Sequence, residues 1–228
     1  ENINWEIYGL IGLKHEVGSS ILGYEVIGSD SDLKELKNIP NKYFINQIGN
    51  KHWKGTALRG ISYDKPRPCI EYGYNNENTV PYVWTEVANQ CPNTVSFLKN
   101  FFGTKFYRII VRNLKSGGKI HPHFDSYKNA LGVSDKTSSA NTKFLILSID
   151  WPDNIIFNIG KYNLPIKTGE AWLLNYSLVH EVANNSNRDR YMLTITGDLD
   201  NSEKFRNSVE QSYQKNSKKL FLEKKNIN

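Results

Sequence analysis

One short segment concentrates residues that can bind a metal ion. Residues 121–125 read His-Pro-His-Phe-Asp and follow the turn-forming run Lys-Ser-Gly-Gly at 115–118. Side chains two positions apart on a β-strand point to the same face, so His121, His123 and Asp125 would share one face. Spacing alone leaves two ligand pairs open, His121 with His123 or His123 with Asp125. Mixed imidazole and carboxylate ligation with open positions is typical of Fe(II) sites, which favours the second pair.

Two residues further along the chain would complete such a site. His180 follows an apolar stretch and supplies the second imidazole of a two-histidine, one-carboxylate triad. Arg190 stands at the head of the next apolar stretch. The planar guanidinium of arginine matches a carboxylate with two parallel hydrogen bonds, so Arg190 suits a dicarboxylate cosubstrate. An isolated histidine or arginine is usually structural, but the joint order of these residues indicates an iron site.

The elements that carry these residues are predicted to be short strands. After Gly103 the sequence turns to runs rich in Ile, Val, Phe, Tyr and Leu, broken by Gly, Pro and Asn. Closely spaced short strands without helices between them predict an antiparallel sandwich or barrel, and a jelly roll fits best. The polar segment 126–141 predicts a loop beside the site that could serve as a substrate lid. The predicted strands cover residues 105–114, 119–125, 142–149, 155–159, 170–175, 180–184 and 191–197.

The rest of the chain predicts helices around this β-rich core. Helices are expected near 31–37 and 94–102, the second with Asn93 as its N-cap and Gly103 after its end. A further helix is expected at 202–225. The length fits a single domain over residues 1–228. Within it we expect a mixed α/β support region at 1–103, a catalytic core at 104–200 and a basic C-terminal helix or tail at 201–228.

Composition excludes several classes of protein. No apolar run approaches the roughly 20 residues that a membrane helix needs, so we expect no membrane partner and a soluble, cytoplasmic protein. Cys69 and Cys91 are too few for a disulfide framework and are expected to be reduced thiols. The net charge is +6, but residues 201–228 hold seven Lys or Arg against three Glu, which indicates a solvated helix face. Without an aromatic stacking pattern, we do not expect nucleic acid as a partner.

About half of the chain, from Trp84 to Leu199, resembles the aspartyl/asparaginyl β-hydroxylase-like group of 2-oxoglutarate oxygenases. The resemblance is carried by Cys-Pro at 91–92, the glycine turn and His-Pro-His-Phe-Asp within 114–125, Gly-Glu-Ala-Trp-Leu-Leu-Asn at 169–175, and His-Glu-Val-Ala-Asn at 180–184 leading to Arg190. It implies a double-stranded β-helix, the cupin-like jelly roll that the strands predict. It also implies that Fe(II) is bound by His123, Asp125 and His180. Arg190 would bind the distal carboxylate of 2-oxoglutarate, with Arg112 near its other end.

The resemblance further implies a reaction. An amino acid, free or within a peptide, would be hydroxylated at the expense of O2 and 2-oxoglutarate, with succinate and CO2 as coproducts; desaturation or ring closure stays open. Halogenation is disfavoured because Asp125 supplies the carboxylate that halogenases of this superfamily lack. The nucleic-acid demethylase branch is disfavoured because only Arg190 fits its RxNxTxR pattern. From the residues alone, Trp53, Arg59, Tyr63 and Arg67, with Arg108 or Arg112, could supply an aromatic wall and an anion clamp for the substrate, or could equally be ordinary surface and core residues.

The alternative from a different class is a non-catalytic double-stranded β-helix module with a binding or structural role. A module of that kind has no need of a complete metal triad followed by an arginine. The sequence therefore favours a 2-oxoglutarate-dependent dioxygenase.

Overall fold

The computed structural model describes residues 34–103, 105–123, 143–159, 162–173, 179–198 and 202–207, and in these residues the strands form two antiparallel sheets. The larger sheet contains β1 (Ile45–Gln47), β2 (Asn50–Gly60), β3 (Val83–Trp84), β4 (Phe106–Leu114), β6 (Lys143–Asp150), β9 (Ala171–Leu173) and β11 (Arg190–Gly197). The smaller sheet contains β5 (Lys119–His123), β7 (Ile155–Ile159), β8 (Tyr162–Asn163) and β10 (His180–Asn184).

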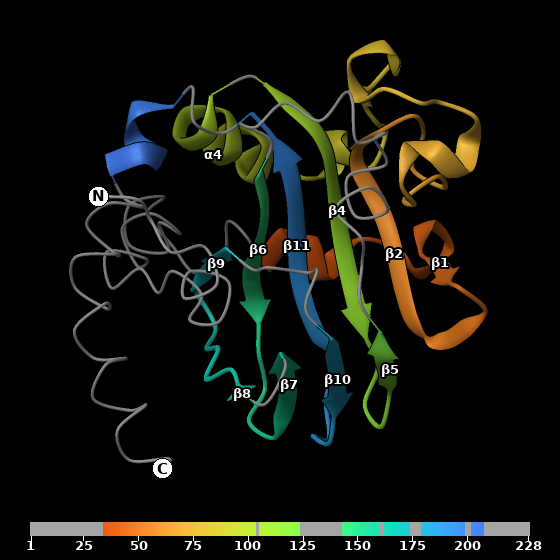
Figure 1. Ribbon diagram of the computed structural model, residues 1–228, viewed down its shortest axis with the longest axis vertical. Helices are drawn as coiled ribbons and strands as arrows, with labels where there is room; N and C mark the ends of the chain where they lie inside the picture. Colours follow the sequence, from red (N-terminus) through yellow and green to blue (C-terminus); the bar gives the residue numbers. More distant parts are fainter. Residues whose placement is uncertain are drawn as a thin grey trace.

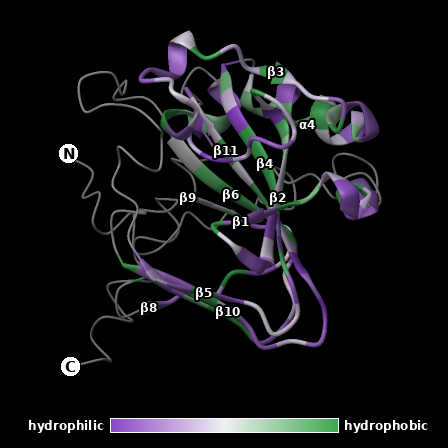
Figure 2. Ribbon diagram, turned by 90° about the vertical axis from the view of Figure 1, so that its right-hand side faces the viewer, coloured by the Kyte–Doolittle hydropathy of each residue, from purple (hydrophilic) through white to green (hydrophobic). Residues whose placement is uncertain are grey.

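The strands from β4 to β11 wind into a jelly roll. They are shared between the sheets in the orders β4-β11-β6-β9 and β5-β10-β7-β8, so the first and last strands of the set are neighbours. Figure 1 shows β4, β11 and β6 side by side, with β5, β10 and β7 beyond their ends. In the side view of Figure 2, the smaller sheet lies below the larger one and at an angle to it. This confirms the predicted mainly β, cupin-like double-stranded β-helix.

Most predicted strands agree with the structure, and one long strand was missed. The strands predicted at 105–114, 155–159 and 180–184 match β4, β7 and β10 to within one residue. No strand is predicted for β2, because Lys, His and Gly interrupt its apolar pattern. β2 nevertheless pairs with β4 from Trp53 to Arg59 and extends the larger sheet. The three-part division of a single domain stays a prediction.

The helix predicted at 94–102 is present as α4 (Pro92–Phe102). Its predicted N-cap is wrong: Cys91 holds that position without a side-chain hydrogen bond, and the helix starts at Pro92. Proline suits a first helical position because its missing N–H would have had no partner there and its φ is already helical. Gly103 ends the helix with φ +82°, as predicted.

The other predicted helices fall partly outside the described residues. Residues 31–33 lie outside them, and the described part of the first prediction overlaps a short 3-10 helix, Glu35–Asn38, which ends one residue beyond the prediction. Of the C-terminal prediction, 203–207 are helical and 208–225 lie outside. No helix in the described part of the chain is long and apolar enough to cross a membrane. Four further 3-10 helices are Asn41–Tyr43, Cys69–Tyr72, Glu77–Thr79 and Ala88–Gln90.

Two hydrophobic clusters cover the two faces of the larger sheet. The outer cluster joins α4, through Phe97, Leu98 and Phe102, to Val111 of β4 and Leu193 of β11. The inner cluster lies between the sheets and consists of Leu114, Ile120, Ile146, Trp151, Phe157, Ile159, Leu164, Ile166, Trp172, Val182 and Met192. Because side chains alternate along a strand, the residues between those of the outer cluster face the smaller sheet. Arg108, Arg112 and Arg190 occupy such inner positions.

Candidate active site

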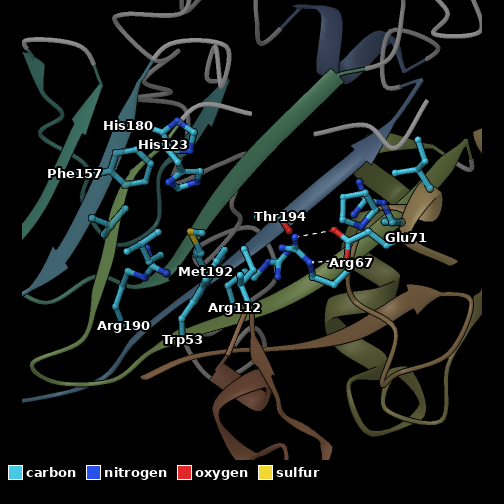
Figure 3. A pocket seen from close by; sticks show the side chains of 16 residues that line it. Trp53, Arg67, Glu71, Arg112, His123, Phe157, His180, Arg190, Met192 and Thr194 are labelled. Carbon is cyan, nitrogen blue, oxygen red and sulfur yellow. Dashed lines mark hydrogen bonds and ion pairs between the residues drawn. The ribbon is translucent and has the colours of Figure 1, made fainter. Parts of the chain in front are cut away.

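The two predicted histidine ligands are neighbours across a pair of strands. β10 pairs with β5 so that His180 lies opposite His123. Their ring centroids are 4.2 Å apart, with an angle of 54° between the ring planes. His180 is 4% exposed, and both side chains line one cavity between the sheets. Figure 3 shows the two rings together at one end of that cavity.

The prediction that His121 shares the face of His123 is wrong. The pairing of β10 with β5 shifts between His180 and Val182. Val182 lies opposite Ile120, whereas regular pairing would place it opposite His121. Two residues of β5, 121 and 122, therefore stand opposite one residue of β10, which is a β-bulge. His121 is exposed and does not line the cavity. The bulge therefore counts against the ligand pair His121 with His123, and the pair His123 with Asp125 stays a prediction.

His123 has the tautomer that a metal ligand needs. Its Nδ1 lies 2.7 Å from the carbonyl oxygen of His121. A carbonyl oxygen only accepts hydrogen bonds, so Nδ1 carries the proton and Nε2 presents its lone pair. Metal-binding histidines commonly donate their second ring N–H to a backbone carbonyl in this way. The bulge therefore orients the ring of His123 as well as exposing His121.

The turn before β5 is fixed to the strands that carry the site. The Gly117 N–H donates to the carbonyl of Asn184, and the Asn184 N–H donates to the carbonyl of Gly118, both at 2.9 Å. Asp189 accepts hydrogen bonds from Lys115 Nζ at 2.7 Å and from the Ser116 N–H at 3.1 Å. These contacts tie the start of β5 to the end of β10 and to the residue before Arg190.

Asp189 stays ionised at neutral pH. Partial burial opposes ionisation, but the hydrogen bonds from Lys115 and Ser116 outweigh it and hold the pKa of Asp189 below its usual value. An ionised carboxylate is a stronger acceptor than a neutral one, which strengthens the link between the turn and β11.

Arg190 lies on the larger sheet, at the head of β11, and its side chain enters the same cavity. The side chain is 0% exposed, and its guanidinium carbon lies 5.1 Å from the ring centroid of Trp151. Stacking on an aromatic face fixes the plane of the guanidinium. The predicted cosubstrate arginine thus faces the cavity that holds both histidines, as Figure 3 shows.

Arg112 lines the cavity and is held by the β1–β2 hairpin. Its Nη1 donates to Gln47 Oε1 at 2.5 Å, and its guanidinium lies 5.5 Å from the ring centroid of Trp53. A Cβ atom on Gly55 would come within 3.2 Å of Arg112 Nη1. Glycine at 55 therefore leaves the space in which this guanidinium lies.

Arg108 is the third arginine on this face and forms a buried ion pair. Its Nε lies 3.7 Å from Glu77 Oε1, and the two side chains are 4% and 3% exposed. Burial raises the pKa of Glu77, and the positive charge of Arg108 acts against that rise. Tyr82 donates a hydrogen bond to the other carboxylate oxygen of Glu77. The segment with Glu77 and Tyr82 is thereby attached to β4.

The far end of the cavity carries an ion pair close to solvent. Arg67 and Glu71 both line the cavity, and Figure 3 shows them at the end opposite the histidines. We call these two residues the rim pair. Arg59 and Tyr63, which the sequence also offered as substrate contacts, do not line the cavity: Arg59 lies over Trp84, and Tyr63 packs edge-on against Tyr43.

The residues present fit a metal ion, although only part of the predicted triad can be placed. Asp125 lies outside the described residues, and the described ranges contain no group of three His, Cys, Asp or Glu side chains with metal-ligand geometry. The fit rests on His123 and His180, whose rings are in contact and of which one has a defined tautomer. Two imidazoles from neighbouring strands suit iron and leave positions for a carboxylate and for substrates.

The cavity also contains residues that sequence reasoning missed. Its volume is about 320 Å³, within the range of small-molecule sites. Met192 and Thr194 line it and follow Arg190 at alternate positions of β11, so strand periodicity could have identified them. Phe157 and Glu71 also line it, but no pattern in the sequence pointed to either residue.

Two sequence features have structural roles. Glu170, 7% exposed, accepts a hydrogen bond from Trp172 Nε1 at 2.9 Å and one from the Lys167 N–H at 3.0 Å. These contacts brace the start of β9. Cys69 and Cys91 are buried, unbridged thiols, as expected, and burial raises their pKa values to about 11 and about 12.

Solved structures with related folds were found at low sequence identity. An oxidoreductase of the 2OG-Fe(II) oxygenase family from Burkholderia pseudomallei is 10% identical over 79% of this chain and 90% of that chain, with a TM-score of 0.45. A viral collagen prolyl hydroxylase from Paramecium bursaria Chlorella virus-1 is 14% identical over 75% and 91%, with a TM-score of 0.39. A cupin domain from Bordetella pertussis is 11% identical over 40% and 80%, with a TM-score of 0.28. Among curated proteins, none matches.

A family model provides the assignment. The model described as aspartyl/asparaginyl beta-hydroxylase matches residues 29–198. The match contains the strands of the jelly roll, both histidines, Asp125 and the arginines of the cavity. It also reaches back over β1, β2 and the rim pair, which the resemblance seen in the sequence did not include. The match covers well over half of the chain, and this protein is therefore a hydroxylase that belongs to the aspartyl/asparaginyl β-hydroxylase family.

Proposed function

We propose that this hydroxylase is an Fe(II)- and 2-oxoglutarate-dependent dioxygenase that acts on an amino acid, free or within a peptide, and forms succinate and CO2 as coproducts. His123, Asp125 and His180 would hold the iron. The observation that carries the proposal is the contact between the His123 and His180 rings in a cavity whose opposite sheet contributes the buried Arg190. A binding module would not need both features in one cavity.

Each described residue has a role that follows from its geometry. His123 offers Nε2 to a metal because its Nδ1 proton is engaged by the carbonyl of His121. His180 brings a second imidazole to the same place from β10. Bound Fe(II) would supply activation of O2 coupled to oxidative decarboxylation of the cosubstrate.

Arg190 would bind the carboxylate of 2-oxoglutarate that is remote from the metal. Its guanidinium is oriented by Trp151 and fully removed from solvent, which strengthens a charge-assisted hydrogen bond. Phe157 and Ile120 also line the cavity and give its wall apolar surface. Arg112, adjacent to Met192 across the β4–β11 pairing, is placed to contact the cosubstrate or the substrate.

The experiment that tests the metal site is anaerobic titration calorimetry with Fe(II), followed by 2-oxoglutarate. The wild type should bind both. His123→Ala and His180→Ala should each lower the affinity for Fe(II) by at least about 100-fold, since loss of a direct ligand exceeds the 10- to 100-fold effect of losing a supporting contact.

His121→Ala is the matched control. This histidine is two residues from His123 but is exposed and does not line the cavity, so its loss should leave Fe(II) binding within about twofold. Equal losses in the His121 and His123 variants would contradict the assignment of His123. Absence of Fe(II) and 2-oxoglutarate binding by the wild type would contradict the proposed function as a whole.

A further inference from the structure

The rim pair is a forked ion pair inside the substrate cavity. Arg67 Nε donates to Glu71 Oε2 at 3.1 Å, and Arg67 Nη2 donates to Glu71 Oε1 at 2.7 Å. Both side chains line the cavity that contains His123 and His180. Figure 3 places them at the end farthest from the histidines. A guanidinium and a carboxylate therefore lie side by side at this end of the cavity.

The rim pair is attached to the sheet below it. The carbonyl of Pro66 accepts a hydrogen bond from Arg112 Nη2 at 3.5 Å, and the Arg67 N–H donates to the hydroxyl oxygen of Tyr72 at 3.1 Å. The prolines on either side of Arg67 restrict the backbone, because their rings fix φ. This support holds the rim pair at a defined place in the cavity wall.

The rim pair is also exposed enough to exchange partners. The side chain of Arg67 is 28% exposed and that of Glu71 is 42% exposed. Ion pairs at such positions contribute only about 0–1 kcal/mol to stability. A ligand that brings its own carboxylate to Arg67 and its own ammonium to Glu71 can therefore replace the contact at little energetic cost.

We propose, on the basis of the oxygenase function above, that the substrate is a free α-amino acid whose charged head group binds Arg67 through its carboxylate and Glu71 through its ammonium. An α-amino acid carries these two charges on adjacent positions, which matches the rim pair. A residue within a peptide chain has neutral amides in their place, so it offers no carboxylate to Arg67 and no ammonium to Glu71.

The middle of the cavity suits the side chain of such a substrate. Figure 3 shows Arg112, Trp53 and Met192 between the rim pair and the end of the cavity with the histidines and Arg190. A head group at the rim would direct the substrate side chain past these groups toward His123 and His180. Hydroxylation would thus fall on the side chain and not on the α-carbon. The volume of about 320 Å³ is near the lower end for small-molecule sites, as expected for one compact ligand beside the cosubstrate.

Two readouts on the full chain test this inference. The first is calorimetric binding, with 2-oxoglutarate present and O2 absent, of each of the twenty common L-amino acids and of its N-acetyl amide. The second is stimulation of succinate formation by the same compounds. At least one free amino acid should bind and stimulate. Its blocked form should bind at least about 10-fold more weakly, because a bound ligand shields two charged-group contacts from solvent that the blocked form cannot make.

Two substitutions test whether the head group of the substrate binds at the rim pair. Arg67→Gln and Glu71→Gln should each raise the Kd and KM of the free amino acid about 10-fold or more, while the Kd of 2-oxoglutarate stays unchanged. Arg188→Gln is the matched control, because Arg188 also forms a 2.7 Å ion pair, with Asp150, but does not line the cavity. If the rim pair were purely structural, the two variants would have a lower Tm but the same selectivity between free and blocked compounds as the wild type.

The outcomes separate this inference from the function on which it rests. Blocked compounds or peptides that bind as well as free amino acids, or no binding of any free amino acid, would overturn the head-group site. Unchanged selectivity in the Arg67→Gln variant would overturn it as well. Selective binding of a free amino acid without any succinate would keep the head-group site and reject the oxygenase reaction.

Discussion

At the scale of single residues, the site depends on which atoms of each side chain are available. His123 is defined by one hydrogen bond from Nδ1, and Arg190 by stacking on Trp151. The types of these residues and their order were predicted from the sequence, because two-histidine ligation followed by an arginine is a restrictive combination. The exposed position of His121 could not be predicted, since it depends on a register shift between two strands.

Replacing Arg190 with lysine should weaken cosubstrate binding selectively. Lysine keeps the positive charge but loses the two parallel hydrogen bonds of the guanidinium and its stacking on Trp151. We expect the Kd of 2-oxoglutarate to rise by about 10- to 100-fold in anaerobic calorimetry, with Fe(II) affinity unchanged. Arg188→Lys is the control and should leave both unchanged. An Arg190→Lys protein that binds 2-oxoglutarate normally would remove this residue from the cosubstrate site.

Replacing Asp189 with asparagine should give a pH-dependent loss of stability. The folded-state pKa of Asp189 lies below its unfolded value of about 3.9, so its charge stabilises the fold above that pH, and the stabilisation is lost as the pH falls through the folded-state pKa. At pH 7 the variant should be less stable by about 1 kcal/mol, from weaker hydrogen bonds with Lys115 and Ser116.

Urea unfolding of the wild type and of Asp189→Asn between pH 3 and 7 measures this difference. It should shrink toward zero at the acid end. A difference that stays constant across the range, or that grows as the pH falls, would show that the carboxylate charge does not stabilise the turn.

At the scale of elements, hairpin turns and bulges place the side chains. The β1–β2 hairpin pairs Gln47 with Asn50 around Ile48 and Gly49, which have φ values of +49° and +68°. Positive φ at both central residues is the geometry of a type I′ turn, which favours Asn-Gly. Isoleucine is strained there because it is β-branched. The sequence does not predict this hairpin, because Ile48 replaces the residue that would have marked it.

Ile48→Asn should stabilise the protein and weaken substrate binding. Asparagine tolerates positive φ, and Ile48 is 69% exposed, so little apolar burial is lost. We expect a gain of about 1 kcal/mol in the free energy of unfolding. Because Ile48 lines the cavity, the KM of the substrate should rise.

Gly49→Ala provides the opposite control, since alanine at φ +68° should lower the free energy of unfolding. Urea denaturation of the two variants against the wild type measures both effects. Loss of stability in Ile48→Asn would contradict the assignment of strain to this turn.

At the scale of the whole molecule, the larger sheet separates two cores. The outer cluster on one face supports the fold, and the inner cluster on the other face borders the cavity. The jelly roll could be predicted because its strands follow one another closely after residue 104. Arg67 and Trp53 were considered beside the substrate, but the full composition of the cavity could not be predicted, because β2 comes from the first half of the chain and reaches the site through pairing with β4. That pairing depends on contacts between distant segments, which local sequence patterns do not encode.

Truncating one aromatic residue in each cluster should separate stability from metal binding. Phe157 is 2% exposed in the inner cluster and lines the cavity, whereas Phe102 is 1% exposed in the outer cluster. Either change to alanine should lower the free energy of unfolding by about 3–5 kcal/mol. At a temperature where both variants are folded, only Phe157→Ala should weaken Fe(II) binding, because Phe157 contacts the space beside the histidines. Equal effects of the two variants on Fe(II) affinity would contradict the separation.

The most direct test of the central claim is succinate formation from 2-oxoglutarate by Fe(II)-loaded protein exposed to O2, with wild type, His180→Ala and His121→Ala assayed together. The iron-oxygenase assignment predicts O2-dependent succinate from the wild type and from His121→Ala, and a loss of at least about 100-fold in His180→Ala. Succinate production that persists in His180→Ala, or that is absent from a wild type shown to bind Fe(II) and 2-oxoglutarate, would contradict the assignment.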